Sequence, residues 1–177
     1  MKTYNPFCEE MLAELQAALG AENVWTAADK LDQYKTDEET DPKKFHMPEA
    51  VVLPGSAEEV AAVVKLCNKY NVPVTVRGGG TSLADGAIPV CGGIILDTKR
   101  MNKIYEVNTE GMYIECGTGA IYKHIEWAAN EVGKATMHYP SSLTCSTVGG
   151  FLAHRGIGVC SNKYGKIDDT RNRNTAP

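Results

Sequence analysis

Val74-Thr-Val-Arg-Gly-Gly-Gly-Thr-Ser-Leu-Ala-Asp-Gly86 is the stretch that decides the fold. A strand-like apolar run ends here in three consecutive glycines, and two hydroxyl residues follow. Glycine adopts positive φ readily, so the N–H groups of Gly78 to Gly80 can point into one concavity, and the hydroxyls of Thr81 and Ser82 can add donors. The stretch predicts an anion-binding loop, with an ordinary glycine-rich turn as the alternative.

The two common phosphate-binding motifs do not fit this loop. The third glycine of G-x-G-x-x-G would fall on Leu83, and Gly86 is followed by Ala87 rather than by the lysine of a P-loop. The loop therefore belongs to some other class of anion site.

A β-α-β unit is expected around the start of this loop. The run Ala50–Leu53 reads as a strand, and Ser56 with Glu59 has the spacing of a capping box that opens a helix ending near Tyr70. A second strand is expected over 72–76. The helix is expected to bury a stripe of four residues: Val60, Val63, Val64 and Cys67.

Two short strands joined by a helical crossover are expected to be parallel neighbours with a right-handed connection. The glycine loop then leaves the carboxyl end of the second strand, which is the edge where open α/β sheets bind ligands.

An antiparallel part is expected after Gly92. The segments 94–97, 104–107 and 112–116 read as extended. Thr118 is expected to cap a second helix that ends at Gly133. The inward face of that helix is expected to carry Ile121, Ile125, Ala128, Ala129 and Val132.

Residues 138–165 lose this periodicity and are rich in Ser, Thr and Gly. Such a segment is expected to wrap a ligand with amides and hydroxyls rather than to build a core. His138 and His154 stand alone, without metal-ligand spacing, so a structural role is expected for both and no metal site is assigned.

The ends of the chain are expected to be peripheral. Glu9–Leu19 reads as an amphipathic helix, and the acidic residues 35–48 read as a solvated connector without a metal role. The expected organisation is an N-terminal helix and connector over 1–47, a main domain over 48–169 and a disordered tail over 170–177.

Composition excludes some classes of partner. The 177 residues are 43% hydrophobic, with a formal net charge of −4 and no basic stripe, which argues against nucleic acid. No stretch approaches the ~18 apolar residues of a membrane span, and a cytoplasmic location is the default expectation.

The six cysteines have no C-x-x-C pair and read as single thiols. Cys67 and Cys116 fall on a predicted helix face and in a predicted strand, where cysteine acts as a small hydrophobe. Cys145 and Cys160 flank the glycine-rich C-terminal region, and no neighbouring histidine or acid marks either as a nucleophile.

Several segments together resemble the FAD-binding oxidase/transferase family with a PCMH-type flavin domain, which includes the D-type chain of glycolate oxidase, D-lactate dehydrogenases and alkyl-dihydroxyacetone-phosphate synthase. The resemblance runs in order from about residue 9 to 169. The segments that carry it are Pro48–Val60, Pro73–Ser82, Gly93–Asp97, Met101–Ile104, Ser146–Gly158 and Lys163–Asp169.

The resemblance implies an α+β fold, with a small parallel β-α-β subdomain followed by an antiparallel α+β subdomain. FAD is the implied cofactor. The residues implied to cradle its pyrophosphate are Arg77, Gly78, Gly79, Gly80, Thr81 and Ser82. Those implied to line the flavin are Pro140, Ser141, Ser142, Thr147, Gly149, Gly150, Arg155, Gly156 and Gly158. Relatives with covalent flavin have a histidine where this chain has Thr81, so non-covalent FAD is implied.

By the same resemblance the chain is the flavin-binding part of an FAD-dependent oxidoreductase that oxidises 2-hydroxy acids such as glycolate or D-lactate. The resemblance stops after Asp169, which suggests a truncated chain whose catalytic residues are not assigned and whose other half a partner chain supplies. The alternative is a non-catalytic flavin-binding fragment or interaction module.

Overall fold

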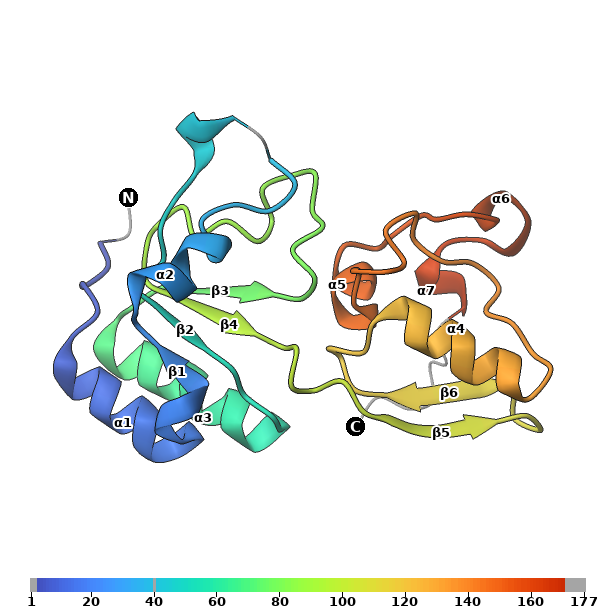
Figure 1. The fold of residues 1–177 in the computed structure, drawn as a ribbon, viewed down its shortest axis with the longest axis horizontal. Coiled ribbons are helices and arrows are strands. Elements are labelled where there is room, and N and C mark those ends of the chain that lie inside the picture. The colour runs from blue at the N-terminus through green and yellow to red at the C-terminus, as the bar shows by residue number, and fades with distance from the viewer. Residues whose placement is uncertain (1–2, 40, 171–177) are drawn as a thin grey trace. The chain divides into compact units, whose positions relative to one another are not determined.

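A four-stranded sheet lies at the centre of the N-terminal unit, Met1–Arg100, of the computed structural model, which describes residues 3–39 and 41–170 (Figure 1). The strand order is β1-β2-β4-β3. Strand β1 pairs antiparallel with β2, whereas β2 and β3 each pair in parallel with β4. The strands are β1 Val24–Trp25, β2 Ala50–Val52, β3 Val74–Arg77 and β4 Ile94–Asp97.

The expectation that the strands at 50–53 and 72–76 are neighbours is wrong, because β4 lies between them. Ile94 of β4 pairs with Ala50 on one side and with Val74 on the other. All four β4 residues are buried, as in a central strand covered on both faces, whereas Val76 of β3 is 60% exposed. A hydrophobic run identifies a strand but does not give its place in the order. The expected parallel direction is confirmed, and β4 belongs to this sheet rather than to an antiparallel part.

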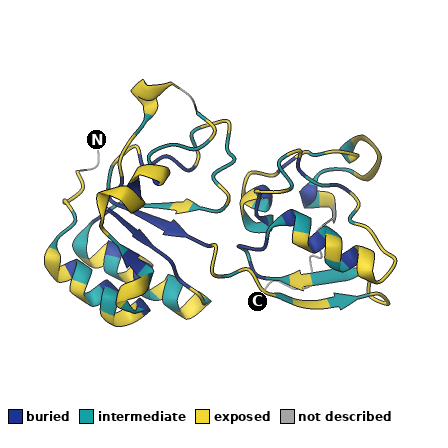
Figure 2. Ribbon diagram, in the orientation of Figure 1, coloured by how far each residue is buried: buried dark blue, intermediate teal, exposed yellow. Residues whose placement is uncertain are grey.

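Two helices cover one face of the sheet (Figures 1 and 2). They are α1, Glu9–Leu19, and α3, Ala57–Tyr70, and both match the expected segments. Val64 is the exception on α3, since it is 39% exposed and does not join the buried stripe. The core on this face consists of Met11, Leu15, Leu19, Val24, Ala50, Val52, Val63, Cys67, Val72, Ile94 and Leu96.

Short helical segments cover the opposite face. Helix α2, Ala28–Leu31, and the 3₁₀ turn η2, Asp32–Tyr34, place Leu31 and Tyr34 against sheet residues. Two further 3₁₀ turns are η1, Ala21–Asn23, and η3, Pro42–Lys44. The core on this face consists of Leu31, Tyr34, Val51, Leu53 and Ile95. The unit therefore has three layers, with the sheet in the middle.

Both ends of α3 are fixed as the sequence predicts. The Ser56 hydroxyl accepts the N–H of Glu59 at 3.2 Å, and Asn71 ends the helix in the left-handed conformation with φ 54°. The Glu59 carboxylate reaches back to the N–H of Gly55 rather than to that of Ser56, at 2.7 Å. This variant of the capping box fixes where the crossover leaves β2.

The C-terminal unit, Met101–Pro177, begins with an antiparallel hairpin of β5, Ile104–Asn108, and β6, Tyr113–Cys116. Helix α4, Tyr122–Glu131, follows. The prediction that Thr118 caps α4 is wrong, because Ile121 occupies the N-cap and the helix begins later. Ile125 and Ala129 are buried as expected, whereas Val132 lies beyond the helix end and is 43% exposed.

Three short helices complete this unit: α5 Val148–Ala153, α6 Ser161–Tyr164 and α7 Ile167–Thr170. The expectation that 138–165 builds no core is wrong, because Phe151 of α5 packs against Tyr122 and Ile167. Its ring meets that of Tyr122 edge-on, with centroids 5.3 Å apart. Of the expected tail, Thr170 ends α7, and residues 171–177 lie outside the described residues.

Candidate functional site

The glycine loop leaves the carboxyl end of β3, where the sequence places it. Of the three glycines only Gly80 has positive φ, at +67°, so the expectation of left-handed geometry at all three is wrong. The N–H groups of residues 78 to 82 nevertheless donate to no acceptor within 3–39 and 41–170. Unsatisfied consecutive amides at a sheet edge are suited to an anion.

Arg77 lies behind the loop. Its guanidinium is partly buried, and its Nη1 donates to the Thr36 carbonyl at 2.6 Å. A Cβ built on Gly80 would stand 2.2 Å from Arg77 Nη2, so the guanidinium packs directly against this glycine. No carboxylate in the described part of the chain forms an ion pair with it. Burial lowers the Arg77 pKa, but a guanidinium stays protonated, so a cation without an ion pair backs the loop.

The two hydroxyl residues behave differently. The Ser82 hydroxyl accepts the N–H groups of Ala84 and Gly86 at 3.1 and 3.2 Å, so it shapes the turn that follows the glycines. No partner within 3–39 and 41–170 engages the Thr81 hydroxyl. Thr81 is therefore the freer of the two donors for a ligand.

The glycines of the second predicted region have packing roles within their unit. A Cβ on Gly149 would meet Thr118 Oγ1 at 1.7 Å, one on Gly156 would meet the Phe151 ring at 2.0 Å, and one on Gly158 would meet the Tyr139 carbonyl at 2.1 Å. These glycines allow close approach of the chain, which any larger residue would prevent.

Other predicted residues of this region lie on the same loops and on α5. Thr147 is the N-cap of α5, and its Oγ1 accepts the N–H of Gly150 at 3.3 Å. Ser141 is exposed, and Ser142 and Pro140 are half-buried and buried. Arg155 is exposed and pairs with Asp168 at 2.7 Å. The two predicted regions belong to different units, and each is described by itself.

His138 and His154 have contrasting surroundings. His154 is exposed, whereas His138 is 2% exposed, and neither of its ring nitrogens has a hydrogen-bond partner in the described part of the chain. Burial lowers the pKa of His138, partly offset by the charge of Asp169. Two orphaned nitrogens next to the predicted segment 140–142 are consistent with a polar ligand in this unit.

The cysteines are all free thiols. Cys67 is buried, which confirms its expected packing role, and burial raises its pKa to about 11. Cys116 is half-buried in β6, while Cys145 and Cys160 are exposed. Within 3–39 and 41–170, no three His, Cys, Asp or Glu side chains gather closely enough to hold a metal ion.

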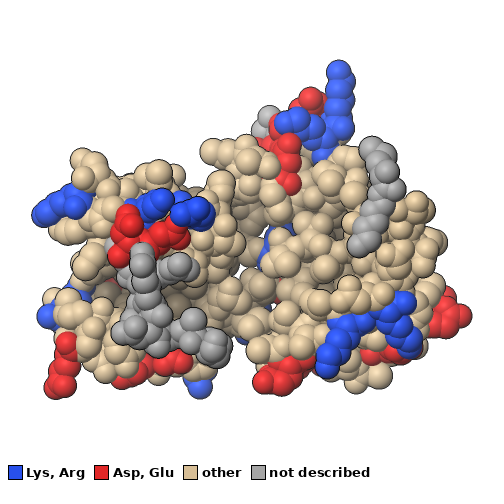
Figure 3. All heavy atoms as spheres, turned by 180° about the vertical axis from the view of Figure 1, so that it is seen from behind, with Lys and Arg blue, Asp and Glu red and all other residues tan. Residues whose placement is uncertain are grey.

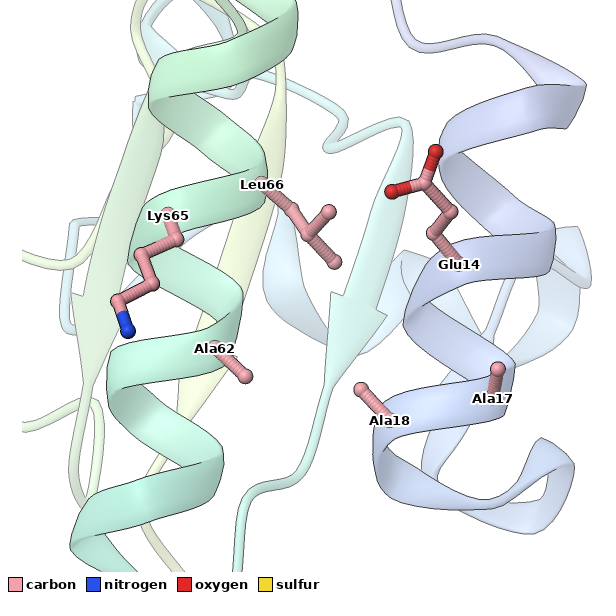
Figure 4. Close-up of a pocket in the computed structure, with 6 residues that line it drawn as sticks. All are labelled: Glu14, Ala17, Ala18, Ala62, Lys65 and Leu66. Atoms are coloured by element: carbon pink, nitrogen blue, oxygen red, sulfur yellow. The ribbon is translucent and has the colours of Figure 1, made fainter.

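A groove of 460 Å³ lies between α1 and α3 (Figure 4). Its lining is Glu14, Ala17, Ala18, Ala62, Lys65 and Leu66. The Glu14 carboxylate already accepts hydrogen bonds from Lys69 and Tyr70, at 2.6 Å each. The groove therefore offers small apolar side chains and one engaged acid, which is not the equipment of an anion or redox site.

Charges are mixed on the molecular surface. On the face drawn in Figure 3, basic and acidic side chains lie next to one another rather than in one basic area. None of the helices in the described part of the chain combines the length and the apolar character that a membrane crossing needs.

The comparisons agree with the loop geometry. The family model described as the FAD binding domain matches residues 48–173, so the chain belongs to this family and FAD is its cofactor. The chain is 40% identical over 117 residues to a D-lactate dehydrogenase of Archaeoglobus fulgidus, covering 66% of this chain and 26% of that protein. It is 33% identical over 128 residues to glycolate oxidase subunit GlcD of Bacillus subtilis, covering 72% and 27%.

Solved structures show the same architecture. An alkyldihydroxyacetonephosphate synthase matches with a TM-score of 0.84 and 28% identity, over 96% of this chain and 33% of that one. A p-cresol methylhydroxylase matches with a TM-score of 0.75 and 27% identity, over 84% and 30%. These likenesses confirm the PCMH-type FAD-binding fold. The chain spans about a quarter of the length of the two curated relatives.

The sequence did not single out Tyr34, Thr36 or Asp97. The Thr36 carbonyl receives Arg77, and the Tyr34 hydroxyl donates to Asp97 Oδ2 at 2.7 Å, directly behind the glycine loop. Thr36 lies 41 positions from Arg77 in the chain, and no sequence pattern links them.

Proposed function

We propose that this chain is the flavin-binding part of an FAD-dependent oxidoreductase that acts on a 2-hydroxy acid such as glycolate or D-lactate. The carrying observation is the row of unsatisfied amides at 78 to 82 with the Arg77 cation behind them. Such a row matches the two phosphates of FAD. The names of the D-lactate dehydrogenase and glycolate oxidase relatives support the substrate class.

In this proposal the chain supplies binding and orientation. The amides of 78 to 82 and the Thr81 hydroxyl hold the diphosphate, and the loops from Pro140 to Ser142 and from Arg155 to Gly158 line the flavin. Bound FAD supplies the two-electron acceptor for oxidising a 2-hydroxy acid to a 2-oxo acid. Thr81 has no nucleophilic ring nitrogen for a flavin bond, which supports non-covalent attachment.

Two finer points follow. Six free thiols support a reducing compartment, which is the cytoplasm in our proposal. A partner chain that supplies a substrate-binding half is proposed because the relatives are much longer than this chain. The same observation favours the second candidate, a non-catalytic flavin-binding or interaction module.

Titration of the chain with FAD, riboflavin and ADP tests the proposal, with flavin fluorescence as the readout. FAD is expected to bind more tightly than riboflavin, which lacks the diphosphate, and ADP is expected to compete. Bound FAD is expected to leave with the filtrate after denaturation. Equal affinity for FAD and riboflavin would contradict the cradle.

Anaerobic addition of glycolate or D-lactate to the FAD-loaded chain separates the two candidates. Bleaching of the flavin absorbance supports a catalytically competent chain. FAD binding without bleaching supports the binding module.

A further inference from the structure

The acidic segment 34–38, which the sequence analysis treats as a solvated connector, contacts the glycine loop at several points. Nη1 of Arg77, the residue before the triplet, donates to the Thr36 carbonyl at 2.6 Å, and the Glu38 N–H donates to the Ser82 carbonyl at 3.3 Å. The Asp37 carboxylate accepts the N–H of Ala87 at 3.4 Å. The segment thus touches the loop at its start, at its middle and at its end.

The segment is itself anchored to the sheet. Tyr34 is 3% exposed, and its hydroxyl donates to the buried Asp97 of β4 at 2.7 Å. Lys99 completes this network, because its Nζ donates to the Tyr34 hydroxyl at 2.6 Å and lies 3.1 Å from Asp97 Oδ2. A buried, hydrogen-bonded network of this kind has little freedom to move.

Arg77 connects the anchor to the loop. Its guanidinium carbon lies 5.3 Å from the centre of the Tyr34 ring, and its other side packs on Gly80, the glycine with positive φ. The planar group therefore fills the space between the buried tyrosine and the loop. A lysine retains the charge but lacks the flat surface and the fork of donors.

We propose that residues 34–38 form a strap that holds the glycine loop in its anion-binding conformation through Arg77, Ser82 and Ala87. The strap residues are positioning residues, since they act on the loop rather than on the ligand. The loop amides have no acceptor of their own among the described residues, so the strap supplies the order that they lack. Such preorganisation lowers the entropy lost when a ligand binds. The inference rests on the proposed function only in naming that ligand as the FAD diphosphate.

The test uses the full chain with Asp37→Ala and Arg77→Lys, and with Asp32→Ala as a matched control. Asp32 is an exposed acid next to the strap whose partner is Lys35. The first readout is the ¹⁵N order parameters of the amides of 78 to 82 without ligand. The wild type and Asp32→Ala are expected to give values near those of a rigid backbone, about 0.85, and the two strap variants values below about 0.6.

The second readout is FAD affinity by calorimetry. Asp37→Ala and Arg77→Lys are each expected to raise the Kd about tenfold, and Asp32→Ala is expected to leave it unchanged. If wild-type chain fails to bind FAD while the order parameters fall as expected, the proposed function fails and the strap stands. If wild-type chain binds FAD and both strap variants keep wild-type order parameters and affinity, the strap is overturned and the proposed function stands.

Discussion

Gly80 is the residue where backbone conformation and side-chain packing meet. Its φ of +67° belongs to the left-handed region, and its missing Cβ leaves room for the Arg77 guanidinium. Neither requirement applies to its neighbours Gly78 and Gly79 in the same way, since neither has positive φ. A glycine triplet in a sequence therefore contains positions of unequal importance.

Gly80→Ala is expected to weaken FAD binding at least about tenfold, because the new Cβ displaces Arg77. Left-handed strain alone costs roughly 1–2 kcal/mol of stability. Gly133→Ala is the matched control, since Gly133 has φ +70° but nothing within 4 Å of the position that a Cβ would take. Urea denaturation should show similar strain in both variants, and flavin titration a loss of affinity in Gly80→Ala alone. Thr81→Ala should lose less affinity, about 0.5–1.5 kcal/mol. Equal losses in Gly80→Ala and Thr81→Ala would refute this account.

His138 makes the stability of the C-terminal unit depend on pH. Burial lowers its pKa in the folded chain, so the unfolded chain binds more protons as the pH falls through the ordinary histidine range near ~6.5. The stability that the neutral ring contributes is present above that value and is lost as the pH falls through the folded pKa.

We expect the wild-type chain to be less stable at pH 5 than at pH 7.5, and His138→Phe to reduce this difference. The exposed His154 provides the control variant His154→Phe. Urea denaturation followed by circular dichroism at both pH values measures the effect. An unchanged pH dependence in His138→Phe would rule out His138 as its source.

At the scale of elements, helix α3 is the crossover that fixes β2 relative to the sheet. Its N-terminus depends on one hydroxyl, since Ser56 Oγ accepts the N–H of Glu59. Ser56→Ala is expected to lower the free energy of unfolding by about 1 kcal/mol, and Ser56→Asp, which keeps an acceptor, is expected to retain most of it. Chemical denaturation of the three proteins checks this. A loss in Ser56→Asp as large as that in Ser56→Ala would show that the cap is not the cause.

The elements also show where hydrophobic pattern suffices. Helices α1 and α3 match their predicted bounds because apolar residues recur with helical spacing and because Ser56, Asn71 and Gly20 mark their ends. Strand β1 has only two residues, which is too short for a pattern to identify it. Helix α5 contains two glycines that pattern analysis assigns to loops, yet Phe151 anchors it in a core.

At the scale of the whole molecule, stability depends on separate cores in the two units. Leu15 of α1 is fully buried in the N-terminal core, whereas Leu83 of the glycine loop is 87% exposed. Leu15→Ala is expected to cost about 2–5 kcal/mol of unfolding free energy, and Leu83→Ala less than about 0.5 kcal/mol. Urea midpoints at constant m-value measure both. A comparable loss in Leu83→Ala would mean that the loop is buried in solution.

The sequence by itself determined the local features: the helices at 9–19 and 57–70, the strands near 50 and 94, and the glycine loop that led to the FAD-binding family. These features depend on neighbours within a few turns of chain, so residue type and spacing record them. Tertiary structure alone decided that β4 separates β2 from β3, that only Gly80 of the triplet is left-handed, and that segment 34–38 contacts the loop. Each of these depends on contacts between residues distant in the chain, and such contacts follow from packing and hydrogen bonding that a single sequence pattern does not encode.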